Sequence, residues 1–234
     1  MSTSLAFHPR ENFAAVQAAT SLLSRSTPAF PDRAGPHVPQ GLPARHFTQD
    51  SKIFAEGDAA AHFYRVASGV VRTCKFFSDG RRQIDAFYIA DDVFGLEAGT
   101  QYGLSAEAVS DCSVIPYRRR GLETMATQDN GMALQLYSYA MRYLEHTRAH
   151  SLLLGRGTAL QKLATFLLQM ARDRPATDVV DLAMTRQDIA DYLGLTIETV
   201  SRTLTLFERQ GVIALSTARR ICLKDRACLQ RYNV

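Results

Sequence analysis

The chain has 234 residues, of which 46% are hydrophobic, and a formal net charge of +4. This length allows one large domain or two small ones with sizeable cores. The sequence contains no apolar run of the roughly 18 residues that a membrane-spanning helix needs, and its N-terminus lacks the apolar centre of a secretory signal. We therefore expect a cytoplasmic protein that has no membrane partner.

Positive charge is concentrated in the C-terminal third of the chain. Residues 156–234 hold 12 Lys and Arg against 8 Asp and Glu, whereas residues 1–155 are balanced at 15 against 15. Such an excess attracts an anionic partner to this third of the protein, although a small basic excess is common among proteins.

The first 44 residues are predicted to form an N-terminal extension. Residues 13–23 have the pattern of a short helix, and the stretch after them is rich in Pro and Gly. That composition is typical of irregular or flexible backbone. No role for the extension follows from its sequence.

Residues 45–125 are predicted to form a β-sheet domain. Short segments rich in Val, Ile, Phe and Tyr alternate with turn motifs, which is typical of a small antiparallel roll or barrel. "SDGRR" is the expected tip of a hairpin, because Gly80 can adopt a positive φ. The turn motifs are "EGD" (56–58), "SG" (68–69), "SDG" (78–80) and "ADD" (90–92).

Residues 126–154 are predicted to form a long helix with an apolar residue at i, i+3, i+7 and i+10. A helix of about 25 residues is about 37 Å long. Because this exceeds what a small domain needs, we expect the apolar stripe to pair with a second copy of the same helix. The alternative is a helix that packs on its own β-domain. The predicted dimer interface consists of Leu134, Tyr137, Met141 and Leu144.

Residues 155–234 are predicted to form a separate C-terminal domain. Gly155 and Gly157 interrupt the helical pattern and indicate a hinge. A further helix follows, and Pro175 marks its end. Its expected buried residues are Leu160, Leu163, Ala164, Leu167, Leu168 and Ala171.

Two short helices are predicted between residues 185 and 211. Thr185 can cap the first helix, with Asp188 favourably placed in its first turn. Gly194 suits the left-handed position that ends this helix. Thr196 can cap a second helix over residues 197–210.

The spacing across these helices is that of a DNA-binding helix-turn-helix. Ala190 supplies the small residue that close crossing requires, Gly194 follows four residues later, and Val200 follows six after that. This Ala-x3-Gly-x5-Val pattern predicts DNA binding, and the alternative is two ordinary packed helices. No metal, P-loop or catalytic motif occurs, so we expect no enzyme activity.

The second helix has two faces. Its inner face carries Val200, Leu204 and Phe207, and its outer face carries Glu198, Arg202, Thr205 and Arg209. In the major groove, Arg202 can donate to guanine O6 and N7, Glu198 can accept from a cytosine amino group, and Ser201 can reach a base or phosphate. A second tier of DNA contacts is expected from Thr196, Ile197, Thr199, Thr205, Arg186, Arg219 and Arg220.

The segment after this helix is predicted to form a two-stranded wing. "VIALSTARRICLKD" (212–225) contains two apolar runs separated by the turn "STARR". Arg219 and Arg220 in this turn are well placed for DNA phosphates, or else they are solvated turn residues.

A β-roll, a long helix, a hinge and a winged helix-turn-helix, in this order, resemble the CRP/FNR family of transcription regulators. "TRQDIADYLGLTIETVSRTL" (185–204) is similar to the family's DNA-binding motif. "EGDAAAHFYRVASGVVR" (56–72) and "DVFGLE" (92–97) are similar to its β-roll. The resemblance covers about residues 45–230 and is strongest to the FixK-type subgroup.

This resemblance implies an α+β fold and a homodimeric activator that works with RNA polymerase. The subgroup activates genes of microaerobic respiration and nitrogen fixation. The resemblance also implies a TTG(A/C)-N6-(T/G)CAA-like palindrome. Glu198 and Arg202 match the family's base-reading positions, and Ser201 matches the serine of its oxygen-responsive branch.

Two departures from the family pattern argue against known effectors. Leu104 stands where cyclic-AMP binders have an arginine before Ser105, and leucine offers no partner to a phosphate. The oxygen-sensing branch has N-terminal cysteines for an iron–sulfur centre, and no cysteine precedes Cys74. We expect no cofactor and regulation through protein abundance. An effector- or redox-gated regulator with a small ligand or haem in the roll is the alternative, although His62 and His146 are expected to be surface residues.

The four cysteines of the chain are predicted to bind no metal. Cys74, Cys112, Cys222 and Cys228 are dispersed, with no C-x-x-C pair. We expect reduced thiols, and a redox role for Cys222 in the wing stays open.

Overall fold

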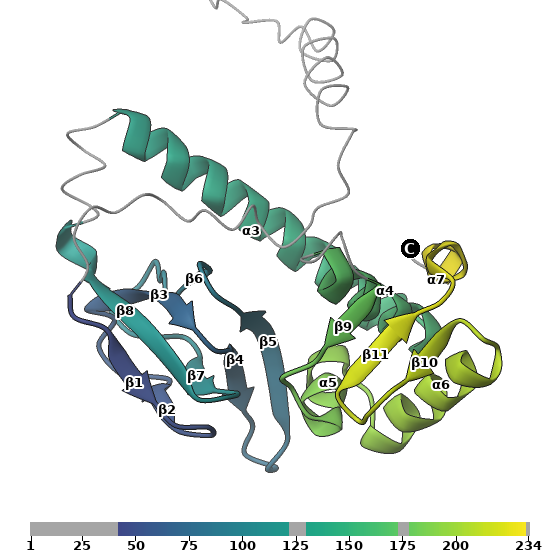
Figure 1. Cartoon of the computed structure of the whole chain (residues 1–234). Helices are drawn as coiled ribbons and strands as arrows, with labels where there is room; N and C mark the ends of the chain where they lie inside the picture. The colour runs from purple at the N-terminus through teal and green to yellow at the C-terminus, as the bar shows by residue number, and fades with distance from the viewer. Residues whose placement is uncertain (1–41, 122–129, 173–177, 233–234) are drawn as a thin grey trace, which may run out of the picture.

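The computed structural model describes residues 42–121, 130–172 and 178–232. A β-roll, the long helix α3 and a smaller C-terminal domain of helices and strands follow each other along the chain (Figure 1). The α+β fold class predicted from the sequence is confirmed. Residues 1–41 of the N-terminal extension, the predicted boundary at residues 125 and 126, and Pro175 lie outside the described residues.

The β-roll consists of two four-stranded antiparallel sheets. One sheet has the order β1-β8-β3-β6 and the other has the order β2-β7-β4-β5. The strands of the first sheet are β1 (Arg45–Phe47), β8 (Cys112–Arg118), β3 (His62–Ser68) and β6 (Val93–Phe94). Those of the second are β2 (Lys52–Phe54), β7 (Ser105–Ala108), β4 (Val71–Phe76) and β5 (Arg82–Tyr88).

Aromatic side chains fill the roll between its sheets. Phe54 stacks on Tyr102 with ring centroids 3.7 Å apart, and Tyr64 stacks on Phe94 at 5.3 Å. Stacked rings of this kind contribute about 0.5–1.5 kcal/mol beyond their buried area. The predicted hairpin tip between β4 and β5 is confirmed, with Gly80 at a φ of 82°.

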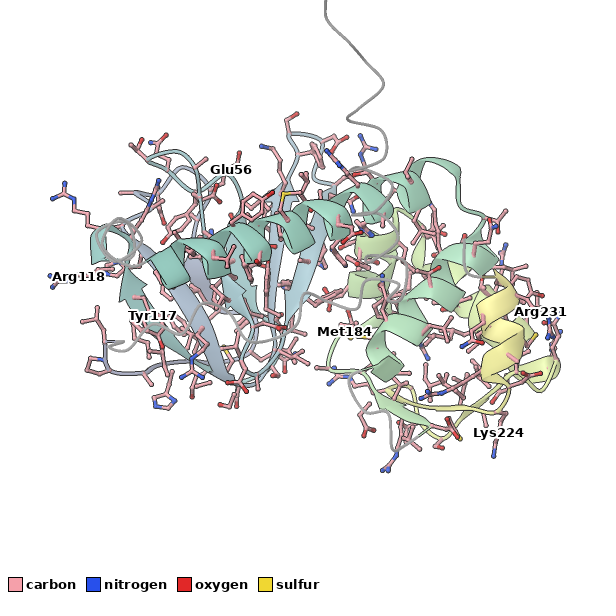
Figure 2. The ribbon with its side chains drawn as sticks, turned by 90° about the horizontal axis from the view of Figure 1, so that it is seen from above. Glu56, Tyr117, Arg118, Met184, Lys224 and Arg231 are labelled. Atoms are coloured by element: carbon pink, nitrogen blue, oxygen red, sulfur yellow. The ribbon has the colours of Figure 1, made fainter. Side chains whose placement is uncertain are left out.

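Helix α3 (Asn130–Arg156) lies along the roll and reaches the C-terminal domain (Figures 1 and 2). Tyr139 on α3 donates its hydroxyl hydrogen to the carbonyl oxygen of Val93 over 2.8 Å. The helix continues two residues beyond the predicted end at residue 154, and the amide of Gly157 still bonds to the Leu153 carbonyl over 2.9 Å. One face of α3 therefore packs on its own roll, as the alternative prediction had it.

Within the described residues, the C-terminal domain combines the helix-turn-helix pair α5 and α6 with two further helices, α4 and α7, and a small antiparallel sheet of order β10-β11-β9. The third strand and the last helix of this domain were not predicted from the sequence. The elements are α4 (Ala159–Arg172), β9 (Val179–Asp181), α5 (Arg186–Leu193), α6 (Ile197–Arg209), β10 (Ile213–Leu215), β11 (Arg220–Leu223) and α7 (Arg226–Tyr232). In the view from above, Arg231 on α7 and Arg118 on β8 lie at opposite ends of the molecule (Figure 2).

The core of the C-terminal domain extends into the roll. Ile84 and Phe87 of β5 belong to the same buried cluster as the residues of α4, α5 and α6. The roll and the C-terminal domain therefore share apolar contacts across their boundary. Of the residues predicted to be buried on α4, Leu160 is half-buried, and Leu163, Ala164, Leu167, Leu168 and Ala171 are buried.

Over the described ranges, no helix combines the length and the apolar character needed to cross a membrane.

Candidate DNA-binding interface

Helix α5 begins at the predicted capping residue. The Oγ1 of Thr185 accepts the amide hydrogen of Asp188 over 3.1 Å, and Asp188 Oδ2 accepts the amide hydrogen of Thr185 over 3.0 Å. This capping box satisfies two amide groups that a helix start otherwise leaves without partners. Burial opposes ionisation of Asp188, but the hydrogen bonds from Thr185 and the charges of Arg72 and Arg82 outweigh it and lower the pKa of this carboxyl.

The turn between α5 and α6 has the predicted geometry. Gly194 adopts the left-handed conformation, with φ 59° and ψ 45°. The amide of Leu195 donates to the carbonyl of Ala190 over 2.9 Å, which closes the turn. Ala190 and Val200 are both fully buried and belong to one cluster. The small residue and the buried aliphatic that a close helix crossing requires are therefore in place.

Helix α6 presents an apolar face inward. Val200, Leu204 and Phe207 are buried, as the sequence pattern predicts. Thr203 is also buried, which the pattern did not show, and its hydroxyl donates to the Thr199 carbonyl over 2.7 Å. A threonine can occupy an inner position in this way because the helix backbone satisfies its hydroxyl. Burial of this face fixes the rotation of α6 about its axis.

The opposite face of α6 is exposed. Glu198, Ser201 and Arg202 all point away from the buried cluster, and Thr205 and Arg209 are exposed beside them. In the part of the chain that the structure describes, the side chains of Glu198 and Arg202 make no ion pair and no hydrogen bond. Their hydrogen-bonding groups are therefore open to an external ligand.

The two-stranded wing is formed as predicted by β10 and β11. The turn between them is held by the Thr217 hydroxyl, which accepts the amide hydrogens of Arg219 and Arg220 over 3.2 and 3.0 Å. Both arginine side chains are exposed. Arg220 Nε lies 3.6 Å from Asp181 Oδ1 on β9, so part of its charge is balanced within the sheet.

The remaining second-tier residues lie at the starts of α5 and α6. Thr196 caps the helix, accepting the Thr199 amide hydrogen over 3.2 Å, and Ile197 is exposed beside it. Arg186 is half-buried, and burial lowers the pKa of its guanidinium. Among the described residues, its buried Nη1 has no hydrogen-bond partner.

Comparison with known proteins matches both domains. Residues 161–232 match the Crp-like helix-turn-helix domain, and residues 44–129 match the cyclic nucleotide-binding domain. The nitrogen fixation regulation protein FixK of Azorhizobium caulinodans is 48% identical over 198 residues, which are 82% of this chain and 79% of the relative. The chain belongs to the CRP/FNR family. It is a DNA-binding transcription regulator of the FixK type.

Other similar proteins agree with this assignment. The transcriptional activatory protein AadR of Rhodopseudomonas palustris is 38% identical over 167 residues, which are 70% of each chain. The solved structure of FixK2 from Bradyrhizobium japonicum superposes with a TM-score of 0.78 at 44% identity, and covers 82% of this chain and 98% of FixK2. These relatives are named as regulators of transcription or nitrogen fixation, not as enzymes.

CRP/FNR regulators are typically dimeric, and α3 of this family member exposes a long apolar stripe. The predicted residues Leu134, Tyr137, Met141 and Leu144 are 65%, 63%, 45% and 40% exposed. Leu152, nearer the C-terminal end of α3, is 70% exposed and was missed because the predicted stripe ended at Leu144, about two turns earlier. Large apolar side chains with such exposure are typical of an interface.

The roll of this CRP/FNR chain has a cavity of about 330 Å³ between the second sheet and α3. Leu104 and Glu97 are among its lining residues, and no Lys or Arg is found among the lining side chains that the structure describes. The Oγ of Ser105 accepts the backbone amide hydrogen of Glu56 over 3.0 Å. The serine retained from the family's phosphate-binding pair is thus engaged by the protein's own backbone.

The four cysteines and His146 are all buried or half-buried. Cys74 and Cys112 are buried, and burial raises the pKa of Cys74 to about 12. Cys222 and Cys228 are half-buried free thiols. The prediction that His146 is a surface residue is wrong, because its side chain lies on the face of α3 that packs toward the roll. Across the described ranges, no three His, Cys, Asp or Glu side chains are grouped as metal ligands.

Proposed function

We propose that the protein is a homodimeric activator whose two α6 helices read a TTG(A/C)-N6-(T/G)CAA-like palindrome. The observation that carries this proposal is the outer face of α6, where Glu198 and Arg202 lie exposed one turn apart and unpaired within the described residues. Their orientation is fixed by the buried Val200, Leu204 and Phe207 on the other side of the helix.

The chemistry of this face suits base recognition. The guanidinium of Arg202 can donate to O6 and N7 of guanine, and the carboxylate of Glu198 can accept from the cytosine amino group. A carboxylate repels the phosphate backbone, so its position at the tip of α6 favours contact with a base. Thr196, Ile197, Thr199, Thr205 and Ser201 would contact the flanking bases or sugars, and Arg186, Arg219 and Arg220 would contact phosphates.

Dimerisation through α3 supplies the second half-site. If the stripe from Leu134 to Leu144 pairs with its counterpart, a two-fold axis relates the two α6 helices. A two-fold symmetric protein reads a palindrome, and successive half-sites lie about one helical turn of DNA apart. RNA polymerase is the further partner that activation requires. The proposal includes a cytoplasmic location, because DNA and RNA polymerase are both found there.

We further infer that DNA binding needs no cyclic AMP. A phosphate in the roll cavity would meet Leu104 and the carboxylate of Glu97, and none of the described lining side chains is cationic. Desolvating an anion against such a lining is unfavourable. Without such an effector, the activity of the regulator would be set by the amount of protein in the cell. The target genes that we propose are those of microaerobic respiration and nitrogen fixation, which the relatives named for nitrogen fixation support. The protein acts by binding and not by catalysis.

The roll cavity also favours a second candidate. Its volume of about 330 Å³ and its aromatic lining, which includes Phe54, Tyr88 and Phe94, are sufficient for a small uncharged effector. In that case the protein would be an effector-gated regulator of the same family.

Footprinting with purified ligand-free protein separates the two candidates. The first predicts protection of a TTGA-N6-TCAA site and stimulation of RNA polymerase on a promoter that carries it, with no added small molecule. A matched duplex with one half-site scrambled is the control. Protection that appears only after a cell extract of small molecules is added would instead support the effector-gated regulator. Absence of protection under both conditions would contradict both.

A further inference from the structure

A cluster of charged side chains joins the β-roll to helix α5. Arg72 on β4 and Arg82 on β5 both donate to Asp188 Oδ1, over 3.0 and 2.6 Å. Arg82 also donates through Nε to Asp191 Oδ2 over 2.8 Å. Two arginines of the roll therefore hold the first helix of the helix-turn-helix at two positions that lie one turn apart.

Burial makes these contacts rigid. The Arg72 and Asp188 side chains are 8% and 3% exposed, and those of Arg82 and Asp191 are 17% and 13% exposed. Arg72 is in turn fixed by Glu107 on β7, which accepts from its Nε and Nη2 over 3.0 and 2.8 Å. Buried pairs of this kind are weakly screened by salt, and breaking one leaves an uncompensated charge.

A second set of contacts acts on the same helix. Gln83 Nε2 donates to the carbonyl oxygen of Tyr192 over 3.3 Å. The Tyr192 ring also meets the Phe87 ring of β5, with centroids 5.4 Å apart and an interplanar angle of 52°. Charged, backbone and aromatic contacts thus all connect β5 to α5, so α5 cannot rotate against the roll without breaking them.

The orientation of α6 follows from that of α5. Ala190 and Val200 join the two helices in one buried cluster, so α6 turns when α5 turns. The roll is tied to α3 by the Tyr139–Val93 hydrogen bond, and α3 is the helix through which two copies would pair. Contacts therefore connect α3 to the roll, the roll to α5, and α5 to α6.

We propose that Arg72 and Arg82 are positioning residues for DNA binding. They lie outside the DNA-binding domain and set how far apart, and at what rotation, the dimer presents its two α6 helices. This inference rests on the proposed dimeric, palindrome-reading function. It assigns the spacing preference to the roll–α5 contact, whereas base preference belongs to Glu198 and Arg202.

The test is the spacing selectivity of Arg82→Gln. Wild type and variant are titrated with three palindromes that have the same half-sites and a spacer of normal length, one base pair shorter or one base pair longer. We expect the variant to bind the normal spacer about tenfold more weakly, because the substitution removes the guanidinium that donates to both Asp188 and Asp191. We also expect its preference for the normal spacer over the other two to fall, while discrimination against a mutated half-site base is retained.

Two further variants make the test decisive. Arg81→Gln is the matched control, because Arg81 is an exposed neighbour whose Nε donates to Asp79 within the same hairpin over 2.6 Å. It should keep the wild-type spacing preference. Asp191→Asn removes the charge at the other end of the contact and should repeat the effect of Arg82→Gln. It decides the question if Arg82→Gln does not fold.

The possible results distinguish failure of the positioning role from failure of the proposed DNA-binding function. A loss of affinity that is equal for all three spacers would show a purely structural role and would overturn the proposal, as would an unchanged spacing preference in Asp191→Asn or in folded Arg82→Gln. A wild type that binds the palindromes no better than scrambled DNA would instead contradict the proposed function.

Discussion

The imidazole ring of His150 on α3 stacks on the phenol ring of Tyr192 on α5, with centroids 4.3 Å apart and planes inclined by 19°. Burial, and then the nearby charges of His146 and Lys162, lower the pKa of His150 to about 4. The ring is therefore neutral at neutral pH. Protonation would place a positive charge in the contact between the long helix and the helix-turn-helix.

This contact predicts a loss of stability in mild acid. An unfolded histidine has a pKa near 6.5, so between about pH 6.5 and 4 the unfolded chain binds a proton at His150 that the folded chain does not. The free energy of unfolding should therefore fall as the pH falls through this window, by about 3 kcal/mol at most. Asp85, whose pKa is raised by burial, contributes with the opposite sign.

His150→Phe isolates this contribution, because it keeps a ring to stack on Tyr192 and removes the titration. Urea unfolding at pH 7.5 and pH 5 should show a smaller difference for His150→Phe than for wild type. His46→Phe, at an exposed histidine on β1, is the control and should keep the wild-type difference. If the free energy of unfolding changes between pH 7.5 and pH 5 by the same amount in wild type and in His150→Phe, His150 does not cause the pH dependence.

Removing the cap of the recognition helix should destabilise the fold. Thr196→Ala deletes the oxygen that accepts the Thr199 amide hydrogen, and loss of such a cap costs about 1 kcal/mol. Thr205→Ala, at an exposed position within the same helix, is the matched control and should cost less. Chemical unfolding of both variants measures the difference, and a loss no greater for Thr196→Ala than for Thr205→Ala would argue against the cap.

The helix crossing should not tolerate a larger side chain at Ala190. This residue is fully buried where α5 and α6 share their core, so Ala190→Leu is expected to cost about 1–3 kcal/mol through overpacking. Ala227→Leu, at an exposed position on α7, should be close to neutral. Thermal unfolding of the two variants provides the comparison. A stable Ala190→Leu protein with unchanged DNA binding would mean that the helices do not need close contact here.

The apolar stripe on α3 predicts a dimer that one charge can disrupt. Met141→Glu places a carboxylate in the middle of the proposed interface, where its counterpart from the second copy would face it. Sedimentation should show a dimer for wild type and a monomer for the variant, with loss of preference for the palindrome over a single half-site. Phe76→Glu, at a similarly exposed aromatic residue on the roll, should stay dimeric. A dimeric Met141→Glu protein would place the interface elsewhere.

Local patterns in the sequence predicted the helix-turn-helix closely. Thr185, Gly194 and Thr196 act through neighbours within five residues, so their roles are readable from spacing alone. The two missed elements, β9 and α7, are short segments of three and seven residues. β9 exists because β11 pairs with it, and this is a long-range contact that no local period reveals.

The contact between the roll and α5 could not be predicted from sequence. Arg82 and Asp188 are 106 residues apart in the chain, and charged residues at such distances carry no pairing signal. His146 was misjudged for a related reason. Its helix was predicted, but the face of α3 that meets the roll depends on how the two elements pack.

The central claim is that Arg202 reads a base from the outer face of α6. The most direct measurement is the affinity of wild type and Arg202→Ala for a TTGA-N6-TCAA duplex and for duplexes with the guanine of each half-site replaced. Wild type should discriminate against the replaced guanine, and Arg202→Ala should lose about 1–3 kcal/mol per half-site together with that discrimination. Unchanged affinity and unchanged base preference in Arg202→Ala would contradict the account.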